Sequence, residues 1–468
     1  MQLGRIKDLI VKNFPFDPTP DQNSFLEVFE TFIKDTSGQD VLILKGYAGT
    51  GKTTVLSAIN RCLGAFRWKI MMLAPTGRAA KVMATYSKSQ AFTIHKLIYK
   101  QQNDPDAGTL SFKRQPNYFK NTLFIVDEAS MIGDEFNFGK QGLLTDLMEY
   151  VFEKPQNKNK LLIVGDPAQL PPVGLEESPA LTAEGIEKIL FYKPEICELT
   201  QVTRQDIDSG ILLHANDIRH KMFNGVYDPV FNTAKFTDIF KMTTERMEDG
   251  LRYAYDKYGQ ENTAVVCRSN YAAVQYNKYI RQVIHWYEHE VEAGELLMVV
   301  RNNYFFLPED SPAGFIANGD FIEVIKMYGE EEMYGYRFAT MRFRMLDYPD
   351  QEPVEAKVLL DTLHQPEASL SSEASRELYI TIRAELEQVA KNKKDLKELI
   401  RSNPYINALQ IKYAYALTCH KSQGGQWDAV FLDRGYFPKE KQDKEYMRWI
   451  YTAVTRAKKE LYLIEKVK

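Results

Sequence analysis

The feature that most constrains this chain is a glycine-rich segment between an apolar run and a run of helix-forming residues. Residues 46–53 read GYAGTGKT, after the apolar residues 41–44 and before residues 55–59. Glycines at this spacing let backbone N–H groups turn inward around phosphate oxygens, and the N-terminus of the following helix adds a favourable dipole. The pattern predicts a phosphate-binding loop between a strand and a helix, and therefore an α/β fold that binds a nucleoside triphosphate.

The side chains of this loop indicate how the nucleotide is held. We expect Lys52 to pair with the β- and γ-phosphates and the hydroxyl of Thr53 to ligate Mg²⁺. The predicted cofactors are therefore ATP and Mg²⁺. The residues of this segment that we expect to contact the nucleotide are Gly46, Ala48, Gly49, Thr50, Gly51, Lys52, Thr53 and Thr54.

Length and composition indicate a soluble protein of several domains. The 468 residues are 44% apolar and 26% charged, and they exceed what one compact core accommodates. The apolar runs are too short to span a membrane, and residues 1–14 are charged and lack the apolar core of a secretion signal. Four scattered cysteines fit neither a metal site nor a disulfide framework, which suits a reducing cytoplasm. We expect a cytoplasmic, nucleoid-associated protein.

Short β-rich runs alternate with helical stretches, a pattern typical of parallel sheets that are covered on both faces. Two sets of such runs predict two α/β lobes. The strand candidates are 41–44, 70–74, 123–126 and 161–164 in the first lobe, and 264–267, 413–417, 429–432 and 461–464 in the second. Residues 318–353 indicate a small β-domain, and residues 371–402 carry apolar residues at helical spacing. The simplest interpretation of that stripe is packing onto a neighbouring element.

Two further constellations follow predicted strands. Asp127 and Glu128 end an apolar strand, where Asp127 is expected to hold the Mg²⁺ shell and Glu128 to polarise the attacking water. An acidic pair at a strand end is a weak signal alone, but it becomes strong together with the phosphate loop. Gln169 follows the next strand between Pro167 and Pro171, and it is placed to sense the γ-phosphate and the water.

These motifs, in this order, resemble those of the superfamily 1 helicases of the RecD and Dda group, the 5′-to-3′ branch, over nearly the whole chain. The remaining matching segments are 19–22, 74–80, 93–97, 198–205, 415–424 and 451–457. The resemblance implies that Gln22 reads adenine and that Arg204 and Arg456 reach the γ-phosphate. A motor needs the γ-phosphate to be contacted from both lobes, and arginine donates to phosphate in a planar fork. The predicted catalytic residues are Lys52, Glu128, Gln169, Arg204 and Arg456.

The resemblance also implies a track for nucleic acid across both lobes. Its partners would be single-stranded DNA and junctions of single- and double-stranded DNA, bound by a monomer. The net charge of −4 argues mildly against such a partner, although a local basic groove can lie on an acidic surface. The candidate contacts are Pro75, Thr76, Arg78, His95, Phe112, Arg268, Ser269, Asn270, Thr418, His420 and Lys421.

The predicted fold is two RecA-like parallel-sheet lobes with inserts. The first lobe would comprise residues 1–97 and 121–203, and the second residues 204–317 and 405–468. Relatives carry a strand-separating pin where this chain has residues 98–120, and residues 109–113 could form its tip; an ordinary surface loop is the alternative. Residues 318–404 would form an SH3-like β insert with a helical extension that could touch the pin.

Two other classes of function share part of this pattern. A kinase or switch GTPase would also use Lys52 and Asp127, but it would need neither Arg456 nor residues 418–423, and the chain has no NKxD guanine motif. A 5′-to-3′ helicase acting on RNA would use the same contacts, because discrimination rests on the 2′-hydroxyl. The resemblance suits DNA repair, recombination or replication and does not choose among them.

Overall fold

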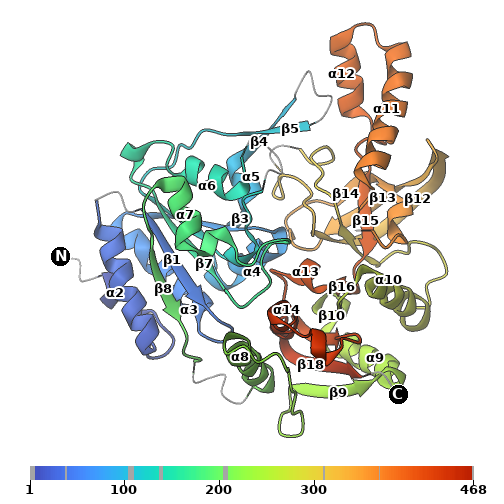
Figure 1. The fold of residues 1–468 in the computed structure, drawn as a ribbon. Coiled ribbons are helices and arrows are strands. Elements are labelled where there is room, and N and C mark those ends of the chain that lie inside the picture. The colour runs from blue at the N-terminus through green and yellow to red at the C-terminus, as the bar shows by residue number, and fades with distance from the viewer. Residues whose placement is uncertain are drawn as a thin grey trace.

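The first sheet places six parallel strands in the order β3-β2-β6-β7-β1-β8 (Figure 1). The computed structural model describes residues 6–36, 40–103, 110–135, 141–203, 209–308, 311–367 and 369–465; of residues 101–103 and 110–112 it describes the backbone. The strands are β1 Val41–Gly46, β2 Lys69–Ala74, β3 Ala91–Thr93, β6 Thr122–Val126, β7 Lys160–Gly165 and β8 Glu195–Leu199. Every residue of β6 and β7 is buried, because helices cover both faces of the sheet.

Alternate residues of these strands enter two different cores. Leu42 and Leu44 pack with α1–α3, whereas Val41 and Ile43 pack with α5–α7 on the opposite face. The helices of this lobe are α1 Ile6–Lys12, α2 Pro20–Lys34, α3 Lys52–Cys62, α4 Gly77–Ser87, α5 Ile94–Ile98, α6 Leu143–Val151 and α7 Ala183–Leu190. The predicted parallel-sheet lobe is confirmed.

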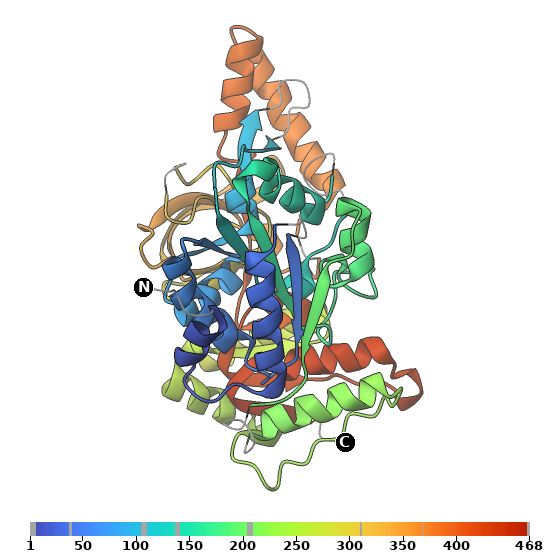
Figure 2. The ribbon, with the colours of Figure 1, turned by 90° about the vertical axis from the view of Figure 1, so that its left-hand side faces the viewer.

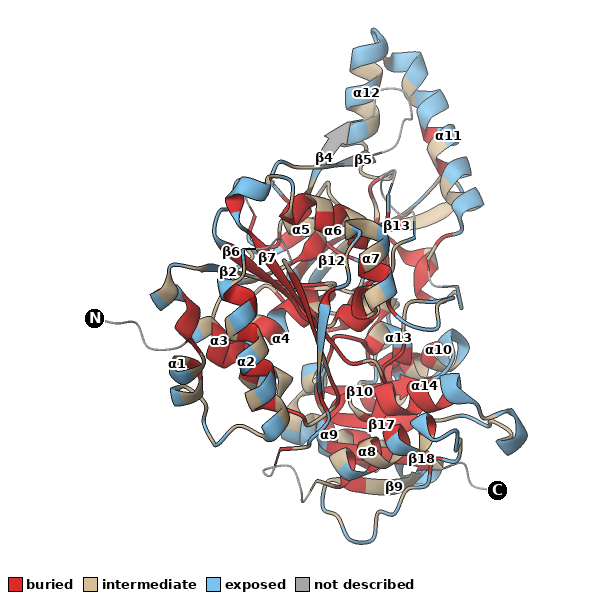
Figure 3. Ribbon diagram, turned by 60° about the vertical axis from the view of Figure 1, so that its left-hand side comes forward, coloured by how far each residue is buried: buried red, intermediate tan, exposed pale blue. Residues whose placement is uncertain are grey.

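The second sheet is also parallel and has five strands in the order β16-β10-β17-β18-β9. They are β9 Ile239–Thr243, β10 Thr263–Cys267, β16 Ala416–Thr418, β17 Trp427–Asp433 and β18 Ala457–Glu465. The helices of this lobe are α8 Gly210–Phe223, α9 Met247–Tyr258, α10 Asn270–Tyr279, α13 Cys419–Ser422 and α14 Lys444–Val454. The two lobes lie one above the other in Figure 3, with their buried strands at the centre of each.

A closed β-barrel interrupts the second lobe. It is formed by β11 Leu296–Val299, β12 Phe321–Met333, β13 Tyr336–Met345, β14 Val354–Leu359 and β15 Leu409–Tyr413. The predicted boundaries of 318 and 404 are therefore too narrow, because β11 and β15 pair with each other and close the barrel. The predicted strand 413–417 is likewise divided: residue 413 ends β15, and β16 begins at residue 416.

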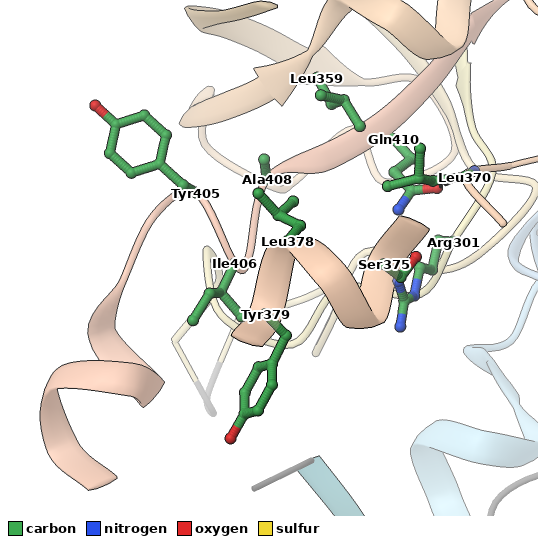
Figure 4. Close-up of a pocket in the computed structure, with 10 residues that line it drawn as sticks. All are labelled: Arg301, Leu359, Leu370, Ser375, Leu378, Tyr379, Tyr405, Ile406, Ala408 and Gln410. Atoms are coloured by element: carbon green, nitrogen blue, oxygen red, sulfur yellow. Dashed lines mark hydrogen bonds between the residues drawn. The ribbon is translucent and has the colours of Figure 1, made fainter. Parts of the chain in front are cut away.

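The predicted helical stripe forms two helices, α11 Ser372–Val389 and α12 Lys393–Ser402, which project from the barrel (Figures 1 and 2). Asn392 accepts hydrogen bonds from the N–H groups of Lys394 and Asp395 and so begins α12. Only the base of α11 is buried, where Leu378 and Ile382 pack on the barrel. A small pocket at this base places Leu378, Leu370 and Ala408 around Gln410 (Figure 4), and the side-chain oxygen of Gln410 accepts the Leu370 N–H at 2.9 Å.

A β-hairpin of β4 Tyr99–Asn103 and β5 Leu110–Arg114 extends from the first lobe toward α11 and α12 in both views (Figures 1 and 2). Its base is attached to α6, because the hydroxyl of Tyr99 donates to Asp146 at 2.6 Å and Arg114 pairs with Glu149. The predicted tip at residues 109–113 is wrong for residues 110–113, which belong to β5; residue 109 lies outside the described residues. Over the described ranges, every helix is too short or too polar to span a membrane.

Candidate active site and nucleic-acid interface

The phosphate loop joins β1 to α3 in the predicted arrangement. Gly51 precedes α3 with a φ of 80°, in the left-handed region that favours glycine. The ammonium of Lys52 donates to the carbonyl oxygens of Gly46 at 2.6 Å and Tyr47 at 3.0 Å. A Cβ on Gly46 would lie 2.8 Å from Cγ of Lys52, so glycine at position 46 leaves the lysine room to fold over the loop.

Gln22 lies behind this loop and is completely buried. Its side-chain oxygen accepts the backbone N–H of Thr19 at 3.0 Å, which caps α2, and its amide nitrogen donates to the carbonyl of Thr50 at 3.0 Å. One end of the amide thus caps α2, and the other holds the loop against this helix. The reading of adenine by Gln22 stays a prediction.

The acidic pair lies at the carboxyl end of β6. Asp127 accepts hydrogen bonds from the hydroxyl of Tyr86 and from the backbone N–H of Glu128, both at 2.8 Å. Glu128 has a φ of 54°, an uncommon conformation for a residue other than glycine. Burial raises the pKa of Glu128, while the positive charges of Arg456 and Lys52 lower it. Cations from both lobes therefore act on this carboxylate.

Arg456 follows the C-terminal end of α14 and is 2% exposed. Its Nε donates to the carbonyl of Thr452 at 3.0 Å, and its Nη1 donates to the carbonyl of Gly425 at 3.1 Å. The second lobe thus fixes the guanidinium that acts on Glu128. Arg204, the other predicted arginine, lies outside the described residues.

Gln169 follows β7 and lies where the two lobes meet. Its neighbour Leu170 is bonded through both backbone groups to the second lobe, the N–H to the Thr452 hydroxyl at 2.9 Å and the carbonyl to the Gln423 amide at 2.7 Å. Gln169 lines a small cavity at this seam together with Lys45, Ser130, Asp166, Glu177, Leu181 and Arg448.

Two residues at the seam were not predicted individually. Tyr451 contacts the phosphate loop, since its hydroxyl accepts the Ala48 N–H at 2.8 Å. Arg219 on α8 places its guanidinium 4.2 Å from the centroid of the Tyr47 ring, and it is 5% exposed. Tyr451 lies within the matching segment 451–457, which could have indicated it, whereas nothing in the sequence around Arg219 marks a contact with the loop.

The residues predicted to bind magnesium are compatible with that ion. Thr53 is exposed in the first turn of α3, and Asp127 is 9% exposed at the end of β6. No cluster of three or more metal-ligating His, Cys, Asp or Glu side chains occurs within the described residues. Magnesium in nucleotide sites needs no such cluster, because substrate phosphates, water and one or two protein oxygens complete its shell.

The nucleic-acid candidates lie at the carboxyl ends of neighbouring strands in each lobe. In the first lobe β2 pairs with β3, and the Thr76 hydroxyl caps α4 by accepting the Ala79 N–H at 3.2 Å. In the second lobe β10 pairs with β16, and the Ser269 hydroxyl caps α10 by accepting the Ala272 N–H at 3.1 Å. Such helix N-termini attract phosphate groups. Pro75 and His95 lie beside the first of these ends, and Asn270, Thr418 and His420 lie beside the second.

Two predicted arginines are committed to contacts within the protein. The guanidinium of Arg78 lies 4.4 Å from the centroid of the Phe321 ring and 4.3 Å from that of Trp427. It therefore joins the first lobe to the barrel and to the second sheet, and its contact with nucleic acid stays a prediction. Arg268 is exposed but stacks 3.7 Å from the centroid of the Phe437 ring.

The remaining candidates differ in their surroundings. Burial lowers the pKa of His95 to about 4, so this ring is neutral at physiological pH. His420 is exposed, and the ammonium of Lys421 donates to the side-chain oxygen of Asn318 at 2.8 Å. The backbone of Phe112 pairs with that of Gln101, while its side chain lies outside the described part of the structure.

A phosphate loop on one parallel-sheet lobe that is contacted by a second such lobe indicates a protein that binds a nucleoside triphosphate. Comparison with known families narrows this class. Residues 30–223 match the family described as AAA domain, and residues 413–464 match the family described as UvrD-like helicase C-terminal domain.

Three curated relatives are similar to this chain. A protein of Acanthamoeba polyphaga mimivirus, R530, is 24% identical over 91% of this chain and 95% of its own length. The ATP-dependent RecD2 DNA helicase of Deinococcus radiodurans is 29% identical over 39% of this chain and 22% of its own length. The ATP-dependent DNA helicase dda of Enterobacteria phage T4 is 27% identical over 46% of this chain and 45% of its own.

Among solved structures, the Bacteroides Pif1 helicase in complex with ADP-AlF3 and single-stranded DNA aligns with a TM-score of 0.47 and 15% identity, over 97% of this chain and 94% of that one. These matches support a likeness of this chain to the superfamily 1B helicases, the RecD- and Dda-like group. The resemblance drawn from the motifs is confirmed.

Proposed function

We propose that this protein is an ATP-driven DNA helicase that moves 5′-to-3′ along single-stranded DNA and unwinds duplex DNA ahead of it. The observation that carries the proposal is that the second lobe contacts the nucleotide site of the first, where the Tyr451 hydroxyl accepts the Ala48 N–H of the phosphate loop at 2.8 Å. Lys52 of the first lobe and Arg456 of the second also both act electrostatically on Glu128. A hydrolytic site completed by two lobes makes hydrolysis depend on their relative position. That dependence is what a motor requires.

The residues divide the chemistry between them. Lys52 and the amides of the phosphate loop bind the phosphates, and the Glu128 carboxylate accepts a hydrogen bond from the attacking water and orients it. Arg456 is fixed and desolvated, so it stabilises the charge that develops on the phosphate oxygens in the transition state without having to reorganise. When bound, magnesium would neutralise phosphate charge, held by Thr53 and Asp127.

Movement follows from two similar sites on the two sheets. Thr76 and Ser269 cap helices at corresponding strand ends, and each helix N-terminus can hold one stretch of phosphodiester backbone. If the lobes approach when ATP binds and part after hydrolysis, the two sites alternately hold and release the strand. Neutral groups such as the hydroxyls and His95 hold phosphates loosely enough for release in every cycle.

The choice of DNA is supported by the relatives, two of which are named DNA helicases. The choice of direction is supported by the resemblance of residues 93–97 and of the β-insert before Thr418 to the 5′-to-3′ branch. We further propose that the working unit is a monomer, that it acts in the cytoplasm, and that the β4–β5 hairpin meets the duplex at the fork.

The decisive experiment measures ATP hydrolysis by the purified protein alone, with single-stranded DNA and with single-stranded RNA. We expect a many-fold rise with DNA, because the strand favours the closed arrangement of the lobes, and weaker binding at higher salt. Stimulation by RNA but not by DNA would assign an RNA helicase. A rate that neither nucleic acid changes would refute the motor.

Direction is tested with duplexes that carry a single-stranded tail on one side. We expect unwinding of duplexes with a 5′ tail and none of those with only a 3′ tail, with blunt duplex as the control. The reverse preference would assign the chain the opposite polarity.

A further inference from the structure

The hydroxyl of Tyr451 bridges two groups of the opposite lobe. It accepts the backbone N–H of Ala48 in the phosphate loop at 2.8 Å and donates to Oδ2 of Asp166 at 2.7 Å. Tyr451 itself belongs to α14 in the second lobe and is completely buried. Burial and the charge of Asp166 raise the pKa of Tyr451 well above its ordinary value, so the hydroxyl stays protonated and can donate.

The same lobe also holds the segment that begins at Asp166. At the other end of this segment, the N–H of Leu170 donates to the hydroxyl of Thr452, and the amide of Gln423 donates to the carbonyl of Leu170. Segment 166–170 of the first lobe is therefore hydrogen-bonded at both ends to side chains of the second lobe. If the second lobe shifts, these contacts must break or carry the segment with it.

Gln169 lies between the two hydrogen-bonded ends of this segment. Its backbone N–H donates to the carbonyl of Asp166 at 3.2 Å, but its side-chain oxygen is buried without a hydrogen-bond partner in the described structure. Ser130 and Arg448 line the same cavity as Gln169, and Oγ of Ser130 and Nε of Arg448 are unpartnered in the same sense. The position of the Gln169 amide is thus set by its backbone, and the backbone is held by the second lobe.

We propose that Tyr451 is a positioning residue that makes the placement of the phosphate loop and of Gln169 depend on the position of the second lobe. The inference rests on the proposed function and deepens it. Arg456 would act on the phosphates themselves when the lobes are together. Tyr451 instead acts on the protein groups around the phosphates, through its hydrogen bonds with Ala48 and Asp166. Loss of the hydroxyl would leave nucleotide and DNA each able to bind, but would weaken the effect of one on the other.

The test replaces Tyr451 by phenylalanine, which keeps the ring and removes the hydroxyl. The matched control is Tyr462→Phe on β18, which removes a tyrosine hydroxyl that donates to a carboxylate, Glu460, at 2.6 Å within the second lobe. Two quantities are measured for each protein: turnover of ATP, and the factor by which a non-hydrolysable ATP analogue changes the affinity for a single-stranded oligonucleotide.

In Tyr451→Phe we expect turnover to fall about tenfold or more, as loss of a hydrogen bond to a charged group suggests, with analogue affinity changed by less than about threefold. The linkage factor, by which we mean the change in oligonucleotide affinity that the ATP analogue causes, is on the order of 5- to 150-fold between coupled sites. In Tyr451→Phe this factor should fall toward one. Tyr462→Phe should retain both quantities. Damage to the fold alone would lower both affinities and would not selectively remove their linkage.

A second variant, Thr452→Val, removes one bond to Leu170 and should also lower the linkage factor. Wild-type linkage and turnover in both variants would overturn the proposal. If the wild-type protein responds to no nucleic acid, the motor function fails. Tyr451→Phe must then still lower DNA-free turnover, because its contacts with Ala48 and Asp166 involve no DNA; unchanged DNA-free turnover would refute Tyr451 separately.

Discussion

The two lobes are built on similar parallel sheets but take different parts in the ATP site. Each presents capped helices at the carboxyl ends of neighbouring strands, α4 at the end of β2 and α10 at the end of β10. Only the first has the phosphate loop and the acidic pair. The second contributes Tyr451 and Arg456, from α14 and the residues that follow it.

This difference separates the binding of ATP, which the first lobe provides, from the effects of that binding, which depend on the second lobe. The first lobe carries the groups that hold the phosphates and orient water, so changes there should remove binding or chemistry itself. The second lobe adds groups that act only when the lobes are together, so changes there should leave binding and remove its consequences. The following predictions test this division, beginning with the largest effect.

Lys52→Ala should abolish measurable ATP turnover, because the lysine is the principal cation that the first lobe brings to the phosphates. Binding of single-stranded DNA without nucleotide should remain close to wild type, since the Lys52 ammonium donates to carbonyl oxygens of its own loop. Steady-state hydrolysis and fluorescence anisotropy measure the two properties. Substantial turnover in this variant would remove the loop from the mechanism.

Arg456→Ala should lower turnover on the order of a thousandfold, the range found for arginines supplied within the same chain, with a modest loss of ATP affinity. The second lobe should act in the transition state more than in binding. Single-turnover kinetics and analogue titration separate these effects. If Arg456→Ala lost only affinity for ATP and kept its single-turnover rate, the proposed difference between the two lobes would be wrong.

Glu128→Gln should hydrolyse ATP on the order of a hundredfold more slowly, because an amide cannot accept a proton from the attacking water as a carboxylate does. The shape of the side chain is retained, so ATP and DNA should still bind. Asp127→Asn provides a comparison at the adjacent position. Near-normal turnover in Glu128→Gln would remove this residue as the group that orients water.

Phe112→Ala tests the role of the β4–β5 hairpin. If the ring stacks at the fork, its loss should slow strand separation several-fold while DNA-stimulated hydrolysis stays nearly unchanged, since stacking of a base on an aromatic ring contributes roughly 1–3 kcal/mol. Unwinding and hydrolysis are measured in the same reaction mixture. Unimpaired unwinding would return residues 98–120 to the role of a surface loop.

The smallest effect concerns acid stability. Stacking of His285 among Tyr255, Tyr287 and Tyr415 buries its ring and lowers its pKa to about 4. Below its ordinary value of 6.5 the unfolded chain binds a proton that the folded chain excludes, so the free energy of unfolding falls as pH drops from about 6.5 toward 4.

His285→Phe removes this titration and keeps a flat ring in the cluster. The melting temperature of the variant should therefore fall less between pH 7 and pH 5, by about 2 °C relative to wild type. Differential scanning calorimetry at the two pH values measures the difference. An equal fall in both proteins would show that the ring is protonated in the folded state.

Local patterns predicted most of the central strands and the phosphate loop. Residues 41–44 and 123–126 fall within β1 and β6 because continuous apolar runs are required where both faces of a sheet are covered. The edge strands β8 and β9 were missed, because only one residue of each is buried and neither has such a run.

Contacts between the lobes were beyond prediction from local pattern. Ala48 and Tyr451 are 403 positions apart, and no periodicity or spacing links them. Arg78 is a second example: nothing in its motif indicated that its guanidinium lies against two rings contributed by distant strands. Motifs indicate which residues matter more reliably than they indicate what those residues touch.

Arg78 holds three parts of the molecule at one point. Its guanidinium lies 4.4 Å from the centroid of the Phe321 ring in the barrel and 4.3 Å from that of Trp427 in the second sheet, and the two rings are inclined to each other at 62°. Because the rings are not parallel, the two attractions act along different directions, and a displacement of the first lobe relative to either ring weakens at least one of them. A single cation therefore restrains the first lobe against both the barrel and the second sheet in more than one direction.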